Sequence, residues 1–359
     1  MIAMQLNPKK IVGSLGRKYG GNRFLKIRKA YYDSIKACKD LIGTGAVFLK
    51  RNAPWSFDKD VDQKLYHDQP ETVTKTGVVC MLDGAIYHGG LTDRLRGILT
   101  AYRESTKKGL PFYILWNDSF NLSDYLLPNT FDWRISEEEI SRSRKNSRAV
   151  VIDDMTPRQS LWRMRAALLS PPRQLHLYTN ADSAIGEYAE LFPKLFRPSE
   201  RLQKAIDRHK QKLGEKYWVF TTRFLTLLGD FNDWCGVVLS EENKMEMMKK
   251  VADEIMILSR QRPEGVKIMV TSDSCSFLDY IKKREPEIYI VEGKIRHIDV
   301  DRDMEESDID DSTMKTFVDQ LLIMGADTVV RMRTGGMYAS GFARFAAEVG
   351  KARFIDHVF

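Results

Sequence analysis

The amino-acid sequence predicts an α/β protein of two domains, each built on a parallel sheet with helices on both faces. Strand-like and helix-like segments alternate over residues 78–178 and again over residues 217–355, which is typical of parallel sheets. With 359 residues, 43% of them hydrophobic, the chain is long enough to form two cores. We therefore expect a basic arm and lead-in helix over residues 1–75, a first Rossmann-like domain over residues 76–199 and a second over residues 200–359.

The N-terminal arm is strongly basic. Residues 1–52 contain 12 Lys and Arg and two Asp, a net charge of +10, although the whole chain carries only +7. Within the arm, apolar residues recur near helical spacing over residues 23–39, which predicts a moderately amphipathic helix. A basic arm is attracted to a membrane leaflet, a lipid-linked phosphate acceptor or nucleic acid, and a solvated helix face explains the pattern equally well.

The first half contains one complete strand–helix–strand unit. After a charged, proline-containing loop over residues 52–75, we expect an apolar strand over 78–82, a helix over 92–107 and a second strand over 112–116. Residues 117–147 are polar and aromatic, so they form either an ordered insertion over a cleft or a disordered connection. The remaining elements expected here are strand 149–152, helix 159–169 and strand 175–178.

The second half repeats the alternation more plainly. A helix over residues 200–212 leads into it, and the acidic residues over 299–311 predict a loop within it. We expect its other elements to be strand 217–222, helix 241–260, strand 266–270, helix 277–283, strand 288–291, helix 314–323, strand 328–332, helix 341–349 and strand 353–355.

A glycine loop joins the first strand to its helix. Gly89 and Gly90 allow the backbone to approach a ligand closely, and a helix that begins near Thr92 points its unpaired N–H groups at the same spot. A phosphate-bearing or sugar-bearing substrate could bind there. The alternative is that the glycines serve only to turn the chain, as they do in many α/β proteins.

Three strands of the second half end in loops rich in hydrogen-bond donors. Arg223 follows the first of these strands, and its guanidinium suits a diphosphate. Residues 271–274 follow the second strand and can hydrogen-bond a base or a ribose. The glycine-rich residues 333–342 follow the third, where the N–H groups and the Ser340 hydroxyl could hold phosphate oxygens. Because ligands of parallel sheets bind at the carboxyl ends of the strands, these loops favour a nucleotide-diphosphate site.

Three segments, spaced along the chain, carry a family resemblance. Residues 89–97 read Gly-Gly-Leu-Thr-Asp-Arg-Leu-Arg-Gly, Thr221-Thr222-Arg223 is followed by Gly229-Asp230, and residues 340–347 read Ser-Gly-Phe-Ala-Arg-Phe-Ala-Ala. They resemble the glycine loop, the His-x-Arg-x-Gly-Asp motif and the Ser-x-Phe-x-x-x-Ala element of the fucosyltransferase superfamily that includes the rhizobial nodulation, bacterial α-1,2- and protein O-fucosyltransferases. Thr221 replaces the His of that motif, and the Gly-Asp pair lies further along.

The resemblance implies a GT-B fold, in which two Rossmann-like domains face each other across a cleft. The N-terminal domain would hold the acceptor and the C-terminal domain would hold GDP-fucose, with no cofactor and no metal required. It implies that Arg223 binds the pyrophosphate, that Asp273 lies near guanine or ribose, and that Ser340 lies near the phosphates. The candidate donor-binding residues are Gly89, Gly90, Arg94, Arg223, Asp273, Ser274, Ser340, Gly341 and Phe342.

Sugar transfer also needs a base that removes the proton of the acceptor hydroxyl. His88 is the first candidate, because the protein O-fucosyltransferases that the chain resembles place a carboxylate just before their glycine. Asp93 is the second candidate. A single histidine in a loop is more often structural than catalytic. Together with Arg223, these two residues make up the predicted catalytic set.

The acidic segment Asp299-Val300-Asp301-Arg302-Asp303 suggests two kinds of metal site. An EF-hand is excluded because Met304 occupies the position that needs glycine. The Asp-x-Asp of a metal-dependent glycosyltransferase is disfavoured because acidic residues continue to Asp311, as in a solvated loop. The four cysteines are scattered without metal-ligand spacing, so they predict reduced thiols in a cytoplasmic protein.

We therefore expect a metal-independent glycosyltransferase that moves fucose, or another sugar, from a GDP-sugar to a glycan hydroxyl in cell-surface polysaccharide or lipopolysaccharide synthesis. The basic residues 1–52 would hold this cytoplasmic enzyme against the anionic inner face of the membrane. Two alternatives stay open. One is a transferase of the same fold that uses another nucleotide sugar, and the other is a non-catalytic module that binds an anionic surface or nucleic acid through the arm. The leading interpretation includes no nucleic-acid partner.

Overall fold

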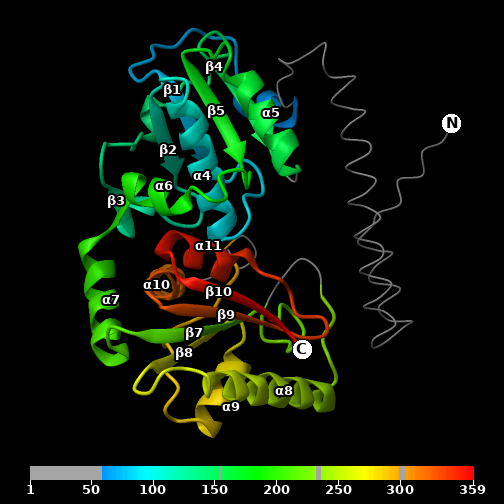
Figure 1. Ribbon diagram of the computed structural model, residues 1–359. Coiled ribbons are helices and arrows are strands. Elements are labelled where there is room, and N and C mark those ends of the chain that lie inside the picture. The colour runs from blue at the N-terminus through cyan, green and yellow to red at the C-terminus, as the bar shows by residue number, and fades with distance from the viewer. Residues whose placement is uncertain (1–58, 154, 232–235, 299–304) are drawn as a thin grey trace, which may run out of the picture.

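The computed structural model describes residues 59–153, 155–231, 236–298 and 305–359. Within these residues the chain forms two four-stranded parallel sheets, one after the other along the sequence (Figure 1). The α/β fold class that the sequence predicts is therefore confirmed. The helix expected over 23–39, the rest of the basic arm and the acidic residues 299–303 lie outside the described residues.

The first sheet has the strand order β2-β1-β5-β4. Its strands are β1 (Gly77–Leu82), β2 (Phe112–Trp116), β4 (Ser147–Ile152) and β5 (Gln174–Thr179), and its helices are α3 (Lys59–Leu65), α4 (Leu91–Thr106) and α5 (Pro157–Ala167). Neighbouring side chains of a strand point to opposite faces, so Val78 and Cys80 pack with α4 and α5 while Val79 and Met81 pack with Tyr66 on the other face. Burial on both faces explains why β1 reads as a continuous apolar run.

Residues 117–147 form an ordered insertion. They include β3 (Leu126–Pro128), which pairs antiparallel with β6 (Phe196–Pro198). Trp133 anchors the insertion, because its buried indole donates a hydrogen bond of 2.7 Å from Nε1 to the carbonyl oxygen of Leu195. The bond satisfies the one polar atom of a large buried ring, so the aromatic character of this segment belongs to its core.

The second sheet has the strand order β10-β9-β7-β8. Its strands are β7 (Tyr217–Thr222), β8 (Lys267–Ser272), β9 (Thr328–Arg333) and β10 (Arg353–Val358). Its helices are α7 (Glu200–Leu213), α8 (Glu241–Ser259), α9 (Cys275–Arg284), α10 (Glu306–Met324) and α11 (Gly341–Gly350). In β7, Tyr217 and Val219 pack with α10 and α11, whereas Trp218 and Phe220 pack with α8 and α9. Helices therefore cover both faces of this sheet as well.

The sequence prediction is wrong about one strand, and it misses the helices α3 and α6 (Tyr188–Leu195) and the short strands β3 and β6. α3 lies within residues 52–75, which are predicted to form a loop. Residues 288–291 do not form a strand, since Tyr289 makes only an isolated bridge with Met269. The helix α6 lies before the second domain. Pro193 lies inside α6, and a proline near the end of a short apolar run conceals its helical pattern.

The acidic segment of the second domain is shorter than expected. A loop is predicted over residues 299–311, but α10 begins at Glu306, so the second part of this segment is helical. Glu306 and Asp308 occupy the first turn of α10. Carboxylates there interact favourably with the positive end of the helix dipole, which explains why a run of acidic residues begins a helix.

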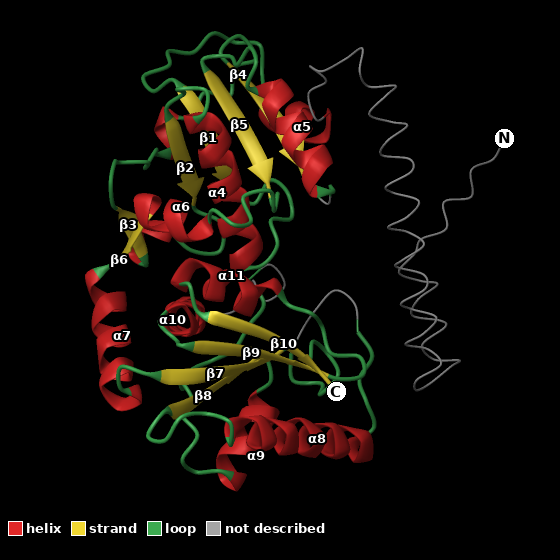
Figure 2. Ribbon diagram, in the orientation of Figure 1, coloured by secondary structure: helices red, strands yellow, loops and turns green. Residues whose placement is uncertain are grey.

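The two domains pack through α11, which contacts α4 and α6 of the first domain (Figure 2). The rings of Tyr188 and Phe345 lie 4.9 Å apart between centroids, and Tyr125 stacks on Phe317 of α10 at 4.9 Å. These rings belong to one apolar cluster that includes residues of both domains. Apolar packing between these rings therefore determines how the two domains, and with them the carboxyl edges of their sheets, lie relative to each other.

No described helix is long and apolar enough to cross a membrane. Cys80 and Cys275, the cysteines within the described ranges, are both free thiols. In the part of the chain that the structure describes, no group of three or more His, Cys, Asp or Glu side chains is arranged to hold a metal ion.

A buried polar network lies behind the glycine loop in the first domain. Arg142 donates hydrogen bonds to Asp83 Oδ2 at 2.9 Å and to the Tyr178 hydroxyl at 3.1 Å. Tyr66 Oη lies 2.5 Å from Nδ1 of His176. His176 is completely buried, and burial lowers the pKa of its imidazole to about 3. The ring is therefore neutral at physiological pH.

Replacing Gly97 with alanine should destabilise the first domain. A Cβ at this position would lie 2.0 Å from the carbonyl oxygen of Thr179, so α4 would have to move away from the end of β5. Alanine favours a helix over glycine by ~1 kcal/mol, but we expect overpacking to lower the free energy of unfolding by about 1–3 kcal/mol. Urea denaturation of Gly97→Ala measures this, with the exposed Thr106→Ala in the same helix as the control. Equal stability of the two variants would show that α4 can shift freely.

The buried His176 predicts a stability that depends on pH. Its folded-state pKa of about 3 lies below the unfolded value of about 6.5, so on unfolding in mild acid the imidazole takes up a proton. Its contribution to stability is complete above about pH 6.5 and is lost toward about pH 3, by at most about 1.4 kcal/mol per pH unit. Denaturation at about pH 7 and about pH 5 should show a smaller difference for His176→Gln than for the parent. An identical difference would contradict a neutral buried ring.

Candidate functional site

The carboxyl edges of the two sheets carry the residues that the sequence singled out. Because all strands of each sheet are parallel, their carboxyl ends share one edge, which is where ligands of such sheets bind. In the first domain this edge carries the glycine loop between β1 and α4. In the second domain Arg223 follows β7, Asp273 follows β8, and the loop that ends at Ser340 follows β9.

Gly89 gives the glycine loop a backbone conformation that side chains rarely allow. Its φ is +80°, and a Cβ there would lie 3.0 Å from both Cβ and Oδ2 of Asp93. Gly90 follows in an extended conformation as the N-cap of α4, and a glycine cap provides no side chain for the first N–H groups of the helix. The carboxylate of Asp93 therefore lies directly over the glycine backbone, and its side chain is 41% exposed.

Arg94, a predicted donor-binding residue, is instead part of the framework of this loop. Its side chain is fully buried. Nε donates to the carbonyl oxygen of Gly89 at 3.1 Å, and the two Nη atoms donate to the backbone and the carboxylate of Asp118 at 3.2 and 3.1 Å. The guanidinium also lies over the ring of Trp116. Arg94 thus ties the glycine loop to the end of β2 and does not face a ligand.

His88, the first candidate base, is also buried, with 4% of its surface exposed. Its Nε2 accepts a hydrogen bond of 3.2 Å from the backbone N–H of Gly84, and its ring stacks on Tyr178. A nitrogen that accepts this bond has its lone pair engaged by the protein. The geometry therefore favours Asp93 over His88 as the residue that meets an acceptor hydroxyl.

Arg223 lies at the end of β7 with 25% of its side chain exposed. Its Nε is 3.4 Å from Oδ2 of Asp273, and its guanidinium lies 4.3 Å from the centroid of the Phe231 ring. These contacts orient a planar group that can form two parallel hydrogen bonds to an anion. Arg223 therefore fits a diphosphate-binding role better than the buried arginines of the site do.

Asp273 shapes the Arg223 loop from below, although the sequence placed it near guanine or ribose. Its two carboxylate oxygens accept hydrogen bonds from the backbone N–H groups of Phe224 at 2.8 Å and Leu225 at 2.7 Å. Leu225 adopts a left-handed conformation with φ of 55°, which costs about 1 kcal/mol for such a residue. Burial raises the pKa of Asp273, while Arg223 and the two N–H groups favour its ionised form. Asp273 is therefore a positioning residue.

Ser274, another predicted donor-binding residue, is completely buried. Its Oγ accepts from the backbone N–H of Phe277 at 3.1 Å and so caps α9, and it donates to Asp230 Oδ2 at 2.8 Å. Asp230 belongs to the Gly229-Asp230 pair that resembles the family motif, so this hydrogen bond joins the pair to the end of β8. The buried Ser274 therefore has a structural role and links α9 to the exposed Asp230.

The N-terminus of α11 lies beside the Arg223 loop. Tyr338 donates a backbone hydrogen bond of 2.9 Å to the carbonyl oxygen of Arg223. Ser340 caps α11, because its Oγ accepts from the N–H of Phe342 at 3.2 Å. The N–H groups of the first turn give this end of the helix a partial positive charge. Arg223 and the positive end of α11 therefore lie next to each other.

Arg96 brings the first domain to the same place. A Cβ added to Gly341 would lie 3.0 Å from Nη1 of Arg96, so the guanidinium of Arg96 lies against the first turn of α11. Arg96 donates to Asp182 Oδ2 at 2.8 Å and forms an ion pair with Asp93. Its Nε is buried and, among the described residues, lacks a hydrogen-bond partner. Arg96 thus forms ion pairs with two carboxylates, but one of its N–H donors has no acceptor among the described residues.

The structure therefore brings together Arg223, the Ser340–Gly341 turn and the Asp93 end of α4. It places His88, Arg94 and Ser274 beneath this surface as supports. The sequence analysis did not assign a role to Arg96, although the residue lies in the quoted glycine-loop segment. Its spacing of three residues from Asp93 on a helix was the signal that could have identified the pair.

Comparisons with known proteins agree on the fold. No protein-family model matches the sequence, and no curated protein matches it significantly. NodZ α-1,6-fucosyltransferase soaked with GDP-fucose is similar in structure, with a TM-score of 0.52 and 15% identity over 77% of this chain and 93% of that chain. Fucosyltransferase NodZ from Bradyrhizobium gives a TM-score of 0.51 and 14% identity over 76% and 92% of the two chains. The chain therefore has the GT-B fold of two Rossmann-like domains that these transferases have.

Proposed function

We propose that this protein is a glycosyltransferase that moves a sugar, most directly L-fucose from GDP-fucose, to a hydroxyl group of a glycan. One observation carries the proposal: Arg223, the N-terminus of α11 and the Asp93–Arg96 pair meet at one place between the two sheets. The solved structures with the same fold support the choice of donor, since NodZ α-1,6-fucosyltransferase was co-crystallised with GDP and soaked with GDP-fucose. The nucleotide and the sugar are our inference for this chain.

The donor diphosphate would bind to the second domain. Arg223 is held in place by Asp273 and by the Phe231 ring, and it can turn its guanidinium to two phosphate oxygens. N–H groups of the first turn of α11 other than that of Phe342, which donates to Ser340, would take further oxygens. Charge that develops on the leaving diphosphate would be stabilised by these fixed donors in the way that a metal ion stabilises it in other transferases.

The acceptor hydroxyl would lose its proton to Asp93. The oxygen of the acceptor would then attack the anomeric carbon, the bond from that carbon to the diphosphate oxygen would break, and the nucleotide would leave with the electron pair. Arg96 holds Asp93 and Asp182. Because Arg96 also touches the first turn of α11, an arriving diphosphate could draw its guanidinium away and leave the Asp93 carboxylate free to act as the base.

The wider setting of the reaction is proposed from the sequence alone. A glycan of cell-surface polysaccharide or lipopolysaccharide is the proposed acceptor, and the cytoplasmic face of the membrane is the proposed location. The basic charge of residues 1–52 supports both, because it would keep the enzyme near anionic lipids or lipid-linked phosphates. The same charge supports the alternative of a non-catalytic binding module.

Two variants should separate donor binding from chemistry. Arg223→Ala should lose most of the rise in melting temperature that GDP causes, because the diphosphate loses its main cation. It should also release GDP from GDP-fucose at least ~100-fold more slowly than the parent. Asp93→Asn should keep the GDP effect on melting temperature but lose roughly 100-fold in GDP release, since it lacks a base. The exposed Arg260→Ala in the second domain is the matched control and should behave as the parent.

Each outcome decides between the readings of this site. A parent protein stabilised by UDP and not by GDP would keep the fold-based proposal but change the donor. A parent that is indifferent to every nucleotide diphosphate and turns none over would favour the binding module. If Arg223→Ala has the activity of the parent, Arg223 does not bind the donor. If Asp93→Asn has full activity, Asp93 is not the base.

A further inference from the structure

The outer face of α5 has an unusual composition for a solvent-exposed helix. Arg158, Trp162, Arg165 and Leu169 follow one another at spacings of four, three and four residues, which places them on one side of α5 and of the turn after it. All four are exposed, Trp162 by 42% and Leu169 by 70%. We call these four residues the α5 face. Two large apolar side chains therefore alternate with two arginines on one exposed surface.

The segment that carries the α5 face is rich in arginine, and the acidic pair Asp153-Asp154 lies just before it. Residues 155–173 contain four arginines and no Asp or Glu. Arg173, the last of them, is exposed just beyond the α5 face. Arg165 is paired with Glu104, so Arg158 and Arg173 provide the positive charge here. A positive surface with exposed apolar side chains is complementary to a surface that is negative outside and apolar beneath.

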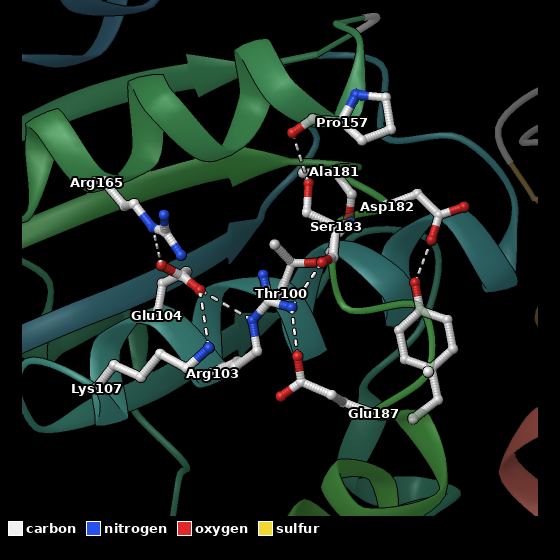
Figure 3. Close-up of polar contacts among 12 residues, drawn as sticks. Thr100, Arg103, Glu104, Lys107, Pro157, Arg165, Ala181, Asp182, Ser183 and Glu187 are labelled. Atoms are coloured by element: carbon white, nitrogen blue, oxygen red, sulfur yellow. Dashed lines mark hydrogen bonds and ion pairs between the residues drawn. The ribbon is translucent and has the colours of Figure 1, made fainter.

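α5 is fastened to the rest of the first domain through Arg165 of the α5 face and through its N-terminus. Arg165 Nε donates to Glu104 Oε2 at 2.6 Å, and Glu104 is buried against Arg103 of α4 (Figure 3). Ser183 donates to the carbonyl oxygen of Pro157 at 2.9 Å at the start of the helix. These contacts tie both α4 and the loop after β5 to α5. A rigid helix therefore presents the exposed side chains of the α5 face.

The end of α5 is secured as well. Arg148 donates to the carbonyl oxygen of Ala167 at 3.2 Å, and Thr156 with Gln159 forms a capping box at the beginning. Met164 and Ala167 are buried against the sheet. Trp162 and Leu169 are therefore exposed because they lie on the side of α5 that faces away from the sheet, and not because the ends of the helix unfold.

We propose that the α5 face is a docking surface for an anionic lipid bilayer. Trp162 and Leu169 would enter the boundary between headgroups and acyl chains, where tryptophan is favoured, while Arg158 and Arg173 contact lipid phosphates, since Arg165 is already paired with Glu104. An anionic bilayer explains the exposed apolar residues, which a nucleic-acid partner would not bury as well. α5 flanks the first sheet and lies apart from the second domain (Figure 1). Docking would therefore leave the proposed donor site open.

Vesicle sedimentation of the full chain tests this surface. The probes are phosphatidylcholine vesicles with and without phosphatidylglycerol. The double variant Trp162→Gln and Leu169→Gln should lower the partition coefficient on anionic vesicles by about tenfold, because it removes the inserted apolar surface. A matched control replaces Met245 and Ile257, which are 53% and 50% exposed on α8, with glutamine. The control should bind the anionic vesicles as the parent does.

A second pair, Arg158→Gln with Arg173→Gln, tests the charge without touching the apolar residues. It should also weaken binding to anionic vesicles, and more strongly at low salt. Binding of parent and both α5 variants with equal strength would overturn the proposal and assign the affinity to the basic residues 1–52. The proposal would also be overturned if the parent bound neutral and anionic vesicles equally. So it would be if the parent bound RNA through the α5 face and did not bind vesicles.

The docking surface and the transferase activity are separate proposals, and the experiments can refute one without the other. All variants should keep the far-ultraviolet circular dichroism spectrum and the GDP-dependent rise in melting temperature of the parent. A variant that loses vesicle binding but keeps both signals supports the docking surface. If the parent ignores GDP but still binds vesicles through α5, the docking surface stands and the transferase proposal fails.

Discussion

The contact between Arg96 and the first turn of α11 is the constraint on which the candidate site depends. It requires Gly341 to lack a side chain, because a Cβ there would lie 3.0 Å from the guanidinium. It also requires α4 to lie close to β5, which Gly97 allows through its contact with Thr179. The apolar packing of Tyr188 on Phe345 holds the two domains at this separation. A few close approaches thus bring the carboxyl edges of two separately folded sheets together.

The arginines near these edges divide into two groups according to their contacts within the protein and their position. Arg94 is saturated by Gly89 and Asp118, and Arg331 and Arg333 both bind Asp356, whose pKa they hold well below its usual range. Arg223 is as exposed as Arg333, 25% against 27%, but it differs in position, because its loop lies beside the first turn of α11. Burying a cation without a partner is costly, so saturated arginines build the framework. The partly exposed Arg223 and the incompletely bonded Arg96 are the groups that an anionic ligand could engage.

Much of the fold follows from local patterns in the sequence. β2 has the predicted bounds, Phe112–Trp116, because a short apolar run between turn residues has few alternatives. The roles within the site do not follow from such patterns. Arg94 and Arg96 look alike in the sequence, and only Asp118 and Trp116, which are distant along the chain, make one of them structural. Asp273 likewise binds a loop 48 residues earlier. The basic arm stays a prediction, since it lies outside the described residues.

Hydrogen exchange of the full chain with and without GDP tests the central claim most directly. If one nucleotide-diphosphate site joins both domains, GDP should slow exchange together in three segments: the Arg223 loop over residues 223–228, the first turn of α11 over 340–344, and the start of α4 over 91–97. These amides lie at the positive helix ends and loops that the diphosphate would contact. A GDP-dependent rise in melting temperature with protection elsewhere, or in the second domain alone, would contradict a site shared by the two domains.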